Sequence, residues 1–254
     1  MAGEVLPARV GRLVSWSNIS VMNDRHPLQP DLLRWSEGNA AAMTAVTLAT
    51  AAGLQPWLLS GCGLLSFVVL LYICRRRWTP AGQFGPANAV SLLRLAGVFV
   101  LPWLAPRQIA YVGLILLALD GVDGWIARRT GLSGEFGEFF DKESDAFFML
   151  MLCLLLYRLP EGIGPWILLP GLLRYLFVLF VKFARPPELK ERRTAKAGWI
   201  SVVMTLTLLC AFAAYPGYLD YCRPLAALMT LLIVYSFAES LHLMYRGSRR
   251  RVQT

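Results

Sequence analysis

The sequence has little of the material from which disulfide frameworks and redox sites are built. Its five cysteines all lie in or beside apolar segments and lack metal-site spacing, so neither a disulfide framework nor a redox centre is supported. It also contains no nucleophile elbow, Walker loop or internal repeat. The first apolar run follows about forty mixed residues, which does not fit a cleavable signal peptide with its short basic start.

Acidic residues are outnumbered, with 16 Asp and Glu against 25 Lys and Arg, which gives a formal net charge of +9. Such an excess can indicate nucleic-acid binding, but here the basic residues gather at the ends of apolar segments instead of forming a patch interleaved with aromatics. We therefore expect no nucleic-acid partner. Anionic lipid headgroups or phosphate esters fit the pattern better.

Apolar residues dominate the chain, since 56% of it is hydrophobic against roughly 45–50% in ordinary soluble domains. Seven runs approach the roughly 20 apolar residues that a helix needs to cross a bilayer. We therefore predict an all-α, polytopic integral membrane protein, with a six-helix bundle and one or two additional N-terminal membrane helices. The runs are Trp57 to Cys74, Ala87 to Leu104, Ile109 to Ala127, Phe139 to Tyr157, Trp166 to Val181, Trp199 to Ala214 and Pro224 to Tyr245.

The runs and breaks divide the chain into four parts. The first part is a soluble or interfacial extension, either with a short amphipathic helix at Val10 to Met22 or as a partly disordered tail. Gln55-Pro56 interrupts the second part, which forms either a helical hairpin or an interfacial helix followed by one span. The parts are 1–39 (extension), 40–77 (additional membrane helix or hairpin), 86–246 (six-helix domain) and 247–254 (basic cytoplasmic tail).

The distribution of basic residues predicts the orientation of the six-helix domain. The triplet ending at Arg77 marks a cytoplasmic end, because basic loops are retained on that side. Following the helices from there leaves only Arg107, Arg158 and Arg223 in the outer connections. We therefore expect the acidic stretch between residues 120 and 145 to face the cytoplasm.

Four aspartates in that stretch stand between apolar runs, where each carboxylate costs a few kcal/mol unless something compensates it. Asp120 and Asp123 share one helix face, and Asp141 and Asp145 share a face of the next helix. A turn between them allows the four to converge. Hard oxygen ligands suit Mg²⁺, Mn²⁺ or Ca²⁺ and not zinc, and a two-metal arrangement is typical of phosphoryl chemistry.

The residues between these aspartates suit a diphosphate. Gly124 and Gly137 remove side chains where a bulky ligand must approach the backbone. Arg128 supplies a permanent positive charge for phosphate.

The stretch matches the pattern D-x2-D-G-x2-A-R-x8-G-x3-D-x3-D without a gap and resembles the signature of the CDP-alcohol phosphotransferase family. The resemblance implies Mg²⁺ or Mn²⁺ as cofactor, with Asp120, Asp123 and Asp141 as the main ligands. It implies that Asp145 is the general base on the acceptor hydroxyl and also touches a metal. The residues implied to hold the CDP moiety are Gly124, Ala127, Arg128, Gly137 and Gly134, where Gly134 replaces a Ser or Thr of many members.

The resemblance extends to the preceding helix, where Asn88, Ser91 and Arg94 resemble the family's P-N-x-x-T-x-x-R opening. Asn88 either meets the nucleotide or caps the helix. Arg94 lies in an apolar run and needs a phosphate or a carboxylate of the cluster as its partner. Arg174 likewise needs a buried anion, and together with Lys196 it is a candidate contact for the acceptor or its phosphate.

The predicted function is transfer of a phosphatidyl group from CDP-diacylglycerol to an alcohol acceptor, releasing CMP. The alternatives are transfer from CDP-choline or CDP-ethanolamine to diacylglycerol, a membrane prenyltransferase, and an ion-coupled transporter. The acceptor stays open among glycerol 3-phosphate, inositol phosphate, serine, choline and phosphatidylglycerol. A homodimer is expected by resemblance only.

Overall fold

The chain folds into a bundle of α-helices, seen in a computed structural model that describes residues 29–75, 77–79, 82–130, 134–160, 162–184 and 195–251. These residues form eight α-helices, two short 3₁₀ helices and no strand, which confirms the predicted all-α fold. The helix predicted at Val10 to Met22 lies outside the described residues. The elements are α1 (Gln29–Ala51), α2 (Trp57–Ile73), α3 (Pro86–Val100), η2 (Leu101–Trp103), α4 (Pro106–Thr130), α5 (Glu135–Tyr157), η3 (Pro165–Ile167), α6 (Leu168–Ala184), α7 (Ala195–Ala214) and α8 (Leu219–Arg251).

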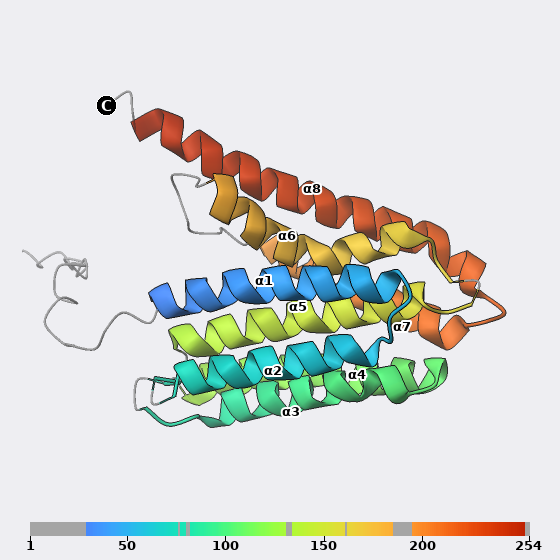
Figure 1. Cartoon of the computed structure of the whole chain (residues 1–254), viewed down its shortest axis with the longest axis horizontal. Coiled ribbons are helices and arrows are strands. Elements are labelled where there is room, and N and C mark those ends of the chain that lie inside the picture. The colour runs from blue at the N-terminus through green and yellow to red at the C-terminus, as the bar shows by residue number, and fades with distance from the viewer. Residues whose placement is uncertain are drawn as a thin grey trace, which may run out of the picture.

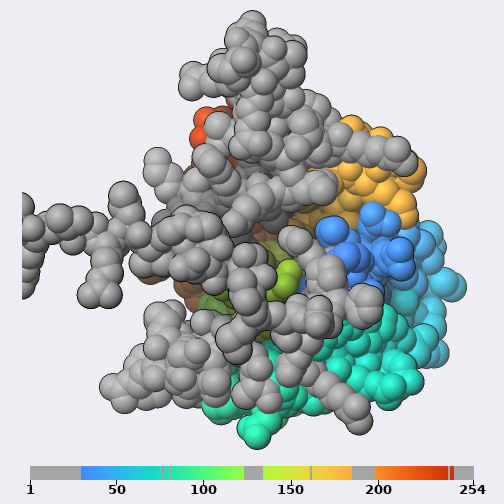
Figure 2. Space-filling model, turned by 90° about the vertical axis from the view of Figure 1, so that its left-hand side faces the viewer, coloured from blue at the N-terminus to red at the C-terminus, as the bar shows by residue number. Residues whose placement is uncertain are grey.

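Successive helices run in alternating directions, so that odd-numbered helices begin at the end of the bundle where even-numbered helices finish (Figure 1). The closest neighbours are α3 with α4, α7 with α8, and α5 with α6, while α1 lies against α6 and α2. Figure 2 looks onto the end where α5 begins, with the first turns of α1 and the last turns of α6 beside it. We call this end the α5 entrance end.

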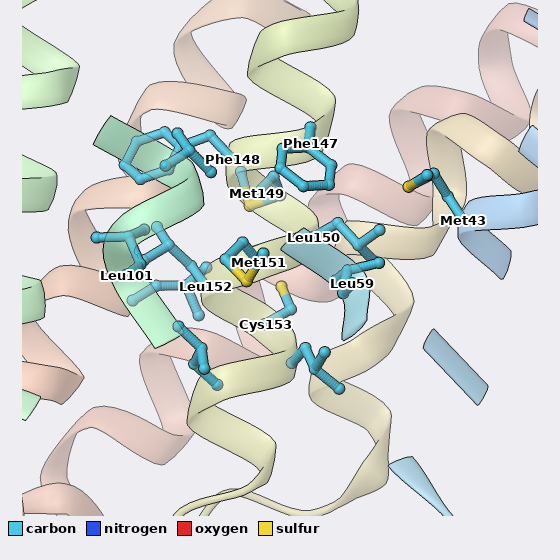
Figure 3. Packing of buried hydrophobic residues seen from close by; sticks show 14 of the residues in the cluster. Met43, Leu59, Leu101, Phe147, Phe148, Met149, Leu150, Met151, Leu152 and Cys153 are labelled. Atoms are coloured by element: carbon cyan, nitrogen blue, oxygen red, sulfur yellow. The ribbon is translucent and has the colours of Figure 1, made fainter. Parts of the chain in front are cut away.

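Helix α5 forms the centre of the bundle. Its residues from Phe147 to Leu156 are all buried, which means that this segment is covered on every side. Figure 3 shows their side chains leaving α5 in several directions, with Leu59 of α2, Leu101 of η2 and Met43 of α1 coming from neighbouring elements. A helix that is apolar all round belongs in the interior of a bundle, which explains why the chain wraps around this one.

Several helices suit a lipid environment. Among the described residues, three helices are long and apolar enough to cross a membrane, at Pro86–Trp103, Pro165–Ala184 and Leu219–Glu239, and two shorter apolar helices accompany them. Large apolar side chains such as Leu65, Tyr111 and Leu231 are about two-thirds exposed on the outer surface. Such an apolar exterior is expected where lipid tails replace water, in agreement with the predicted polytopic membrane protein.

Two helix ends differ from the predicted part boundaries. Helix α1 begins at Gln29, ahead of the predicted boundary at residue 40, and packs with α2 as an antiparallel hairpin. Helix α8 continues to Arg251, into the predicted basic tail. The early start of α1 escaped prediction because its buried face mixes apolar side chains with polar ones. That face consists of Leu32, Trp35, Ser36, Asn39, Ala40, Met43, Thr47 and Thr50.

Candidate active site

Three of the four predicted aspartates converge near the α5 entrance end. Asp120 comes from α4, and Asp141 and Asp145 come from successive turns of α5. One carboxylate oxygen of each lies within 4.8 Å of the others. Each side chain is about one-third exposed, so a ligand can reach the carboxylates. We call these three residues the acidic cluster.

The side chain of Arg94 joins the acidic cluster from α3. It is only 1% exposed, and its guanidinium bonds to Oδ1 of Asp120, to Oδ1 of Asp141 at 2.7 Å and to Oδ1 of Asp145 at 2.9 Å. The partner predicted for Arg94 is therefore a carboxylate of the cluster. A planar guanidinium has several donors in a fixed fork, which suits it to several carboxylates at once.

The donor set of the acidic cluster fits a hard divalent cation. It offers only carboxylate oxygens, which Mg²⁺ and Mn²⁺ prefer over the nitrogen and sulfur ligands of zinc sites. With three ionised carboxylates and one guanidinium, the four side chains carry a formal charge of −3 + 1 = −2. Arg94 bonds to Oδ1 of each carboxylate, and each carboxylate has two oxygens that are chemically able to ligate a cation.

A cavity of about 280 Å³ opens beside the acidic cluster. Arg94, Asp120 and Asp145 form its charged part, and α7 adds the hydroxyl residues Ser201 and Thr205. The remaining wall is mostly apolar, as is common in pockets that bind small molecules. It consists of Leu116, Leu117, Phe148, Gly198, Trp199 and Val202.

Asn88 and Gly137 meet where α3 passes α5. The Asn88 amide donates hydrogen bonds to the carbonyl of Phe84 at 2.6 Å and to that of Trp78 at 3.4 Å. The N-cap position of α3 belongs to Gly85, so Asn88 is not the helix cap. A Cβ atom added at Gly137 would lie 2.9 Å from Asn88 Oδ1, so glycine at this position permits the close approach of the two helices.

The sequence analysis missed the role of Glu143, a buried carboxylate on α5. Glu143 is 1% exposed, and its Oε1 accepts a hydrogen bond of 2.7 Å from Nη2 of Arg174 on α6. This pair supplies the buried anion that Arg174 was predicted to need. The available signal was the charge of Arg174 in an apolar run, but nothing in the linear sequence named Glu143 as the partner.

A comparison with family models shows which protein family the chain belongs to. A model described as CDP-alcohol phosphatidyltransferase matches residues 84–238. The chain belongs to the CDP-alcohol phosphatidyltransferase family. No match was found among curated proteins or among solved structures. Family members are membrane transferases that move a phosphatidyl group from a CDP-alcohol to an acceptor, and the resemblance predicted from the acidic stretch is confirmed.

The CDP-alcohol phosphatidyltransferase region covers all the predicted site residues and leaves out the α1–α2 hairpin, which ends before residue 84. Gly134 occupies the N-cap position of α5 in an extended conformation. For some predicted residues the structure describes the backbone only, in α4 and at the start of α7, and their side chains lie outside the described part. These residues are Asp123, Gly124, Ala127, Arg128 and Lys196.

Proposed function

We propose that this family member transfers a phosphatidyl group from CDP-diacylglycerol to an alcohol acceptor and releases CMP, with Mg²⁺ or Mn²⁺ at the acidic cluster. The observation that supports it most is the convergence of Asp120, Asp141 and Asp145 beside a cavity with an apolar wall. A divalent cation held there, with Asp123 as fourth predicted ligand, would offset the charge of the diphosphate and of the departing CMP oxygen. A two-metal site remains the predicted arrangement.

Asp145 is proposed as the general base. It lines the cavity, so a hydroxyl group bound there can approach its carboxylate. Asp145 accepts the hydroxyl proton while the hydroxyl oxygen bonds to the phosphorus that carries diacylglycerol, and the bond from that phosphorus to the CMP oxygen breaks. Arg94 holds Asp145 in place beside Asp120 and Asp141.

The nucleotide is proposed to bind along the face of α4 and the first turns of α5. Gly137 lies against Asn88, which brings one predicted nucleotide contact from α3 to one from α5. Gly124, Ala127, Arg128 and Gly134 complete the predicted set on the basis of the family pattern. Lys196 and Arg174 stay predicted contacts for an acceptor phosphate, although the bond between Arg174 and Glu143 favours a structural role for the arginine.

The acidic cluster is proposed to face the cytoplasm. Helix α4 starts beside Arg107, α5 finishes beside Arg158, and α8 starts beside Arg223. All three therefore lie at the end of the bundle opposite the α5 entrance end (Figure 1). Among the described residues of this domain, Lys142 lies in the first turns of α5 and Lys182 in the last turn of α6, both toward the entrance end, which supports a cytoplasmic orientation.

The test is CMP release by the full chain, purified in lipid nanodiscs and supplied with CDP-diacylglycerol and one acceptor at a time. We expect release with at least one of the five acceptors named above, dependent on Mg²⁺ or Mn²⁺ and abolished by a chelator. Release only from CDP-choline with diacylglycerol would reverse the donor assignment. No release with any donor and acceptor would refute the proposed activity.

The predicted homodimer is a separate proposal that comes from family resemblance alone. Light scattering of the purified chain in detergent, corrected for the bound detergent, would measure its mass. A mass of one chain at all protein concentrations would contradict the dimer.

A further inference from the structure

An aromatic cluster connects the α1–α2 hairpin to helix α5. Phe67 of α2 lies at its centre, with its ring centroid 5.6 Å from Trp35 of α1, 6.0 Å from Phe140 and 5.8 Å from Phe147. Phe67, Phe140 and Phe147 are each at most 2% exposed. Aromatic pairs at these separations stabilise by about 0.5–1.5 kcal/mol each beyond their burial, so the hairpin is attached firmly at this height of α5.

The packing of α2 on α5 is close. Gly63, one turn before Phe67, faces the ring of Phe147, and a Cβ atom added at Gly63 would lie 2.5 Å from its Cζ atom. Ser60, one turn earlier, donates a hydrogen bond of 3.1 Å to the carbonyl of Phe99 on α3. One face of α2 is therefore shaped to the surface that α3 and α5 present.

Directed bonds fix the hairpin itself. Within it, Trp35 Nε1 donates to the carbonyl of Ser66 at 2.8 Å, and Ser66 Oγ donates to Oδ1 of Asn39 at 2.8 Å. On its other side, Glu37 of α1 pairs with Lys182 of α6 at 2.8 Å. The internal bonds hold α1 and α2 together as one unit. That unit cannot slide along α5 without breaking the ion pair to α6 and the bond from Ser60 to α3.

The aromatic cluster lies at the same height of α5 as the acidic cluster. Phe140 directly precedes Asp141, and Phe147 follows Asp145 by two residues. Phe140 and Phe147 are two turns apart on one face of α5, turned away from the face of the two aspartates. Any shift or rotation of α5 at this point moves Asp141 and Asp145 relative to Asp120 on α4.

We propose that the α1–α2 hairpin is a positioning element of the metal site, and that Phe67 and Gly63 hold α5 so that Asp141 and Asp145 meet Asp120. The hairpin lies outside the region matched by the family model, so the proposed role belongs to a part of the chain that the family match does not cover. The inference rests on the acidic cluster being the divalent-cation site of the proposed function.

The experiment measures Mn²⁺ binding to the purified full chain by the loss of the free Mn²⁺ signal in electron paramagnetic resonance, without substrate. Replacing the supports of metal ligands commonly weakens affinity, and we expect Phe67→Ala to raise the Mn²⁺ dissociation constant by about ten-fold. Phe67→Leu, which retains much of the volume, should show a smaller increase. If Phe67→Ala cannot be purified, the Mn²⁺ affinity of Phe67→Leu is compared with that of the wild type instead.

Phe212→Ala is the matched control. Phe212 is also a fully buried phenylalanine, on α7 near the opposite end of the bundle, so the truncation should lower the melting temperature comparably without changing Mn²⁺ affinity. Equal affinity in wild type and both Phe67 variants would overturn the positioning role. If Phe67→Ala and Phe212→Ala weaken Mn²⁺ binding equally, the effect of Phe67→Ala comes from general destabilisation, and the positioning role is also overturned.

A second pair of variants separates the inference from the metal site on which it depends. Asp141→Asn should abolish most Mn²⁺ binding whether or not the hairpin positions α5. If Asp141→Asn binds Mn²⁺ normally, the metal site itself is refuted. If Asp141→Asn loses binding and the Phe67 variants do not, only the role of the hairpin fails.

Discussion

Helix α5 carries acidic residues on two opposite sides, and the two sides are built differently. Asp141 and Asp145 are each about one-third exposed and share the guanidinium of Arg94 with Asp120. Asp120 and Asp145 line a cavity. Glu143 is two residues from Asp141 and from Asp145, about 200° around the helix. It is almost fully buried and bonds to Arg174 of α6.

The two sides differ in charge balance. The charges of Glu143 and Arg174 cancel each other, and their ion pair joins α5 to α6. On the other side, among the described side chains, three carboxylates share one arginine and leave a formal excess of −2 beside the cavity. The comparison teaches that an acidic residue on α5 is a candidate ligand for a cation only where the negative charge of its neighbours exceeds their positive charge.

The largest expected effect concerns the side of α5 that carries Asp141 and Asp145, which we call the open side. Asp145→Asn should lower the transfer rate by about a hundred-fold to ten-thousand-fold, because the substituted side chain cannot accept the hydroxyl proton. Binding of the CDP-lipid should be largely retained, whereas Asp123→Asn should lose the metal-dependent part of binding. Titration of the donor measures both, with the exposed Asp220→Asn of α8 as control. Equal loss of donor binding in the two variants would contradict a separate base role for Asp145.

The second expected effect is a metal dependence of stability. Arg94→Gln removes the cation that holds three carboxylates together, and breaking such a buried pairing costs about 3–5 kcal/mol. Because Mn²⁺ can replace the lost charge, the melting temperature should fall in chelator and recover when Mn²⁺ is added. Thermal melts in detergent with and without the ion test this. Failure of Mn²⁺ to restore any stability would show that the open side does not bind it.

The third expected effect concerns the side of α5 that carries Glu143, which we call the closed side. Glu143→Gln should destabilise the protein by about 3 kcal/mol, because it leaves Arg174 without its buried anion, and Mn²⁺ should not restore the loss. The double variant Glu143→Gln with Arg174→Met should recover part of the melting temperature. Glu138→Gln, an exposed position on the same helix, is the matched control. If Mn²⁺ restored the melting temperature of Glu143→Gln, the two sides of α5 would not differ in their response to the ion, and the comparison would be wrong.

The smallest expected effect concerns the pair between α1 and α6 at the surface. Glu37 and Lys182 are both partly exposed, and exposed pairs contribute about 0.2–1 kcal/mol. Glu37→Gln should therefore lower the melting temperature by a degree or two at most, and the change should shrink in high salt. A loss as large as that of Glu143→Gln would mean that the ionic contact, and not the aromatic cluster, fastens the hairpin.

The helices of the six-helix domain were predictable because long apolar runs report burial or lipid contact directly. The convergence of Asp120, Asp141 and Asp145 was also predictable, since spacing by three or four residues places side chains on one helix face. Helix α1 was harder to place. Its buried face includes Ser36, Asn39 and Thr47, which interrupt the apolar pattern in the linear sequence.

The partners of charged residues were not available from the sequence. The single cation Arg94 was open between a phosphate and a carboxylate, and only the packing of α3 against α4 and α5 placed it among the aspartates. The position of Arg174 in an apolar run indicated that it needs an anionic partner, but it did not indicate that the partner is Glu143. A residue's own chemistry states what it must contact, but the choice among equally suitable partners depends on helix rotation and packing.

By itself, the sequence determined the membrane class, the family and the acidic residues proposed to carry the chemistry, because apolar run length and fixed spacing are local properties. The tertiary structure decided which carboxylates share Arg94, which one is neutralised by Arg174, and where the hairpin touches α5. These are contacts between residues far apart in the chain. They depend on how side chains of different helices fill the same space, which no local pattern encodes.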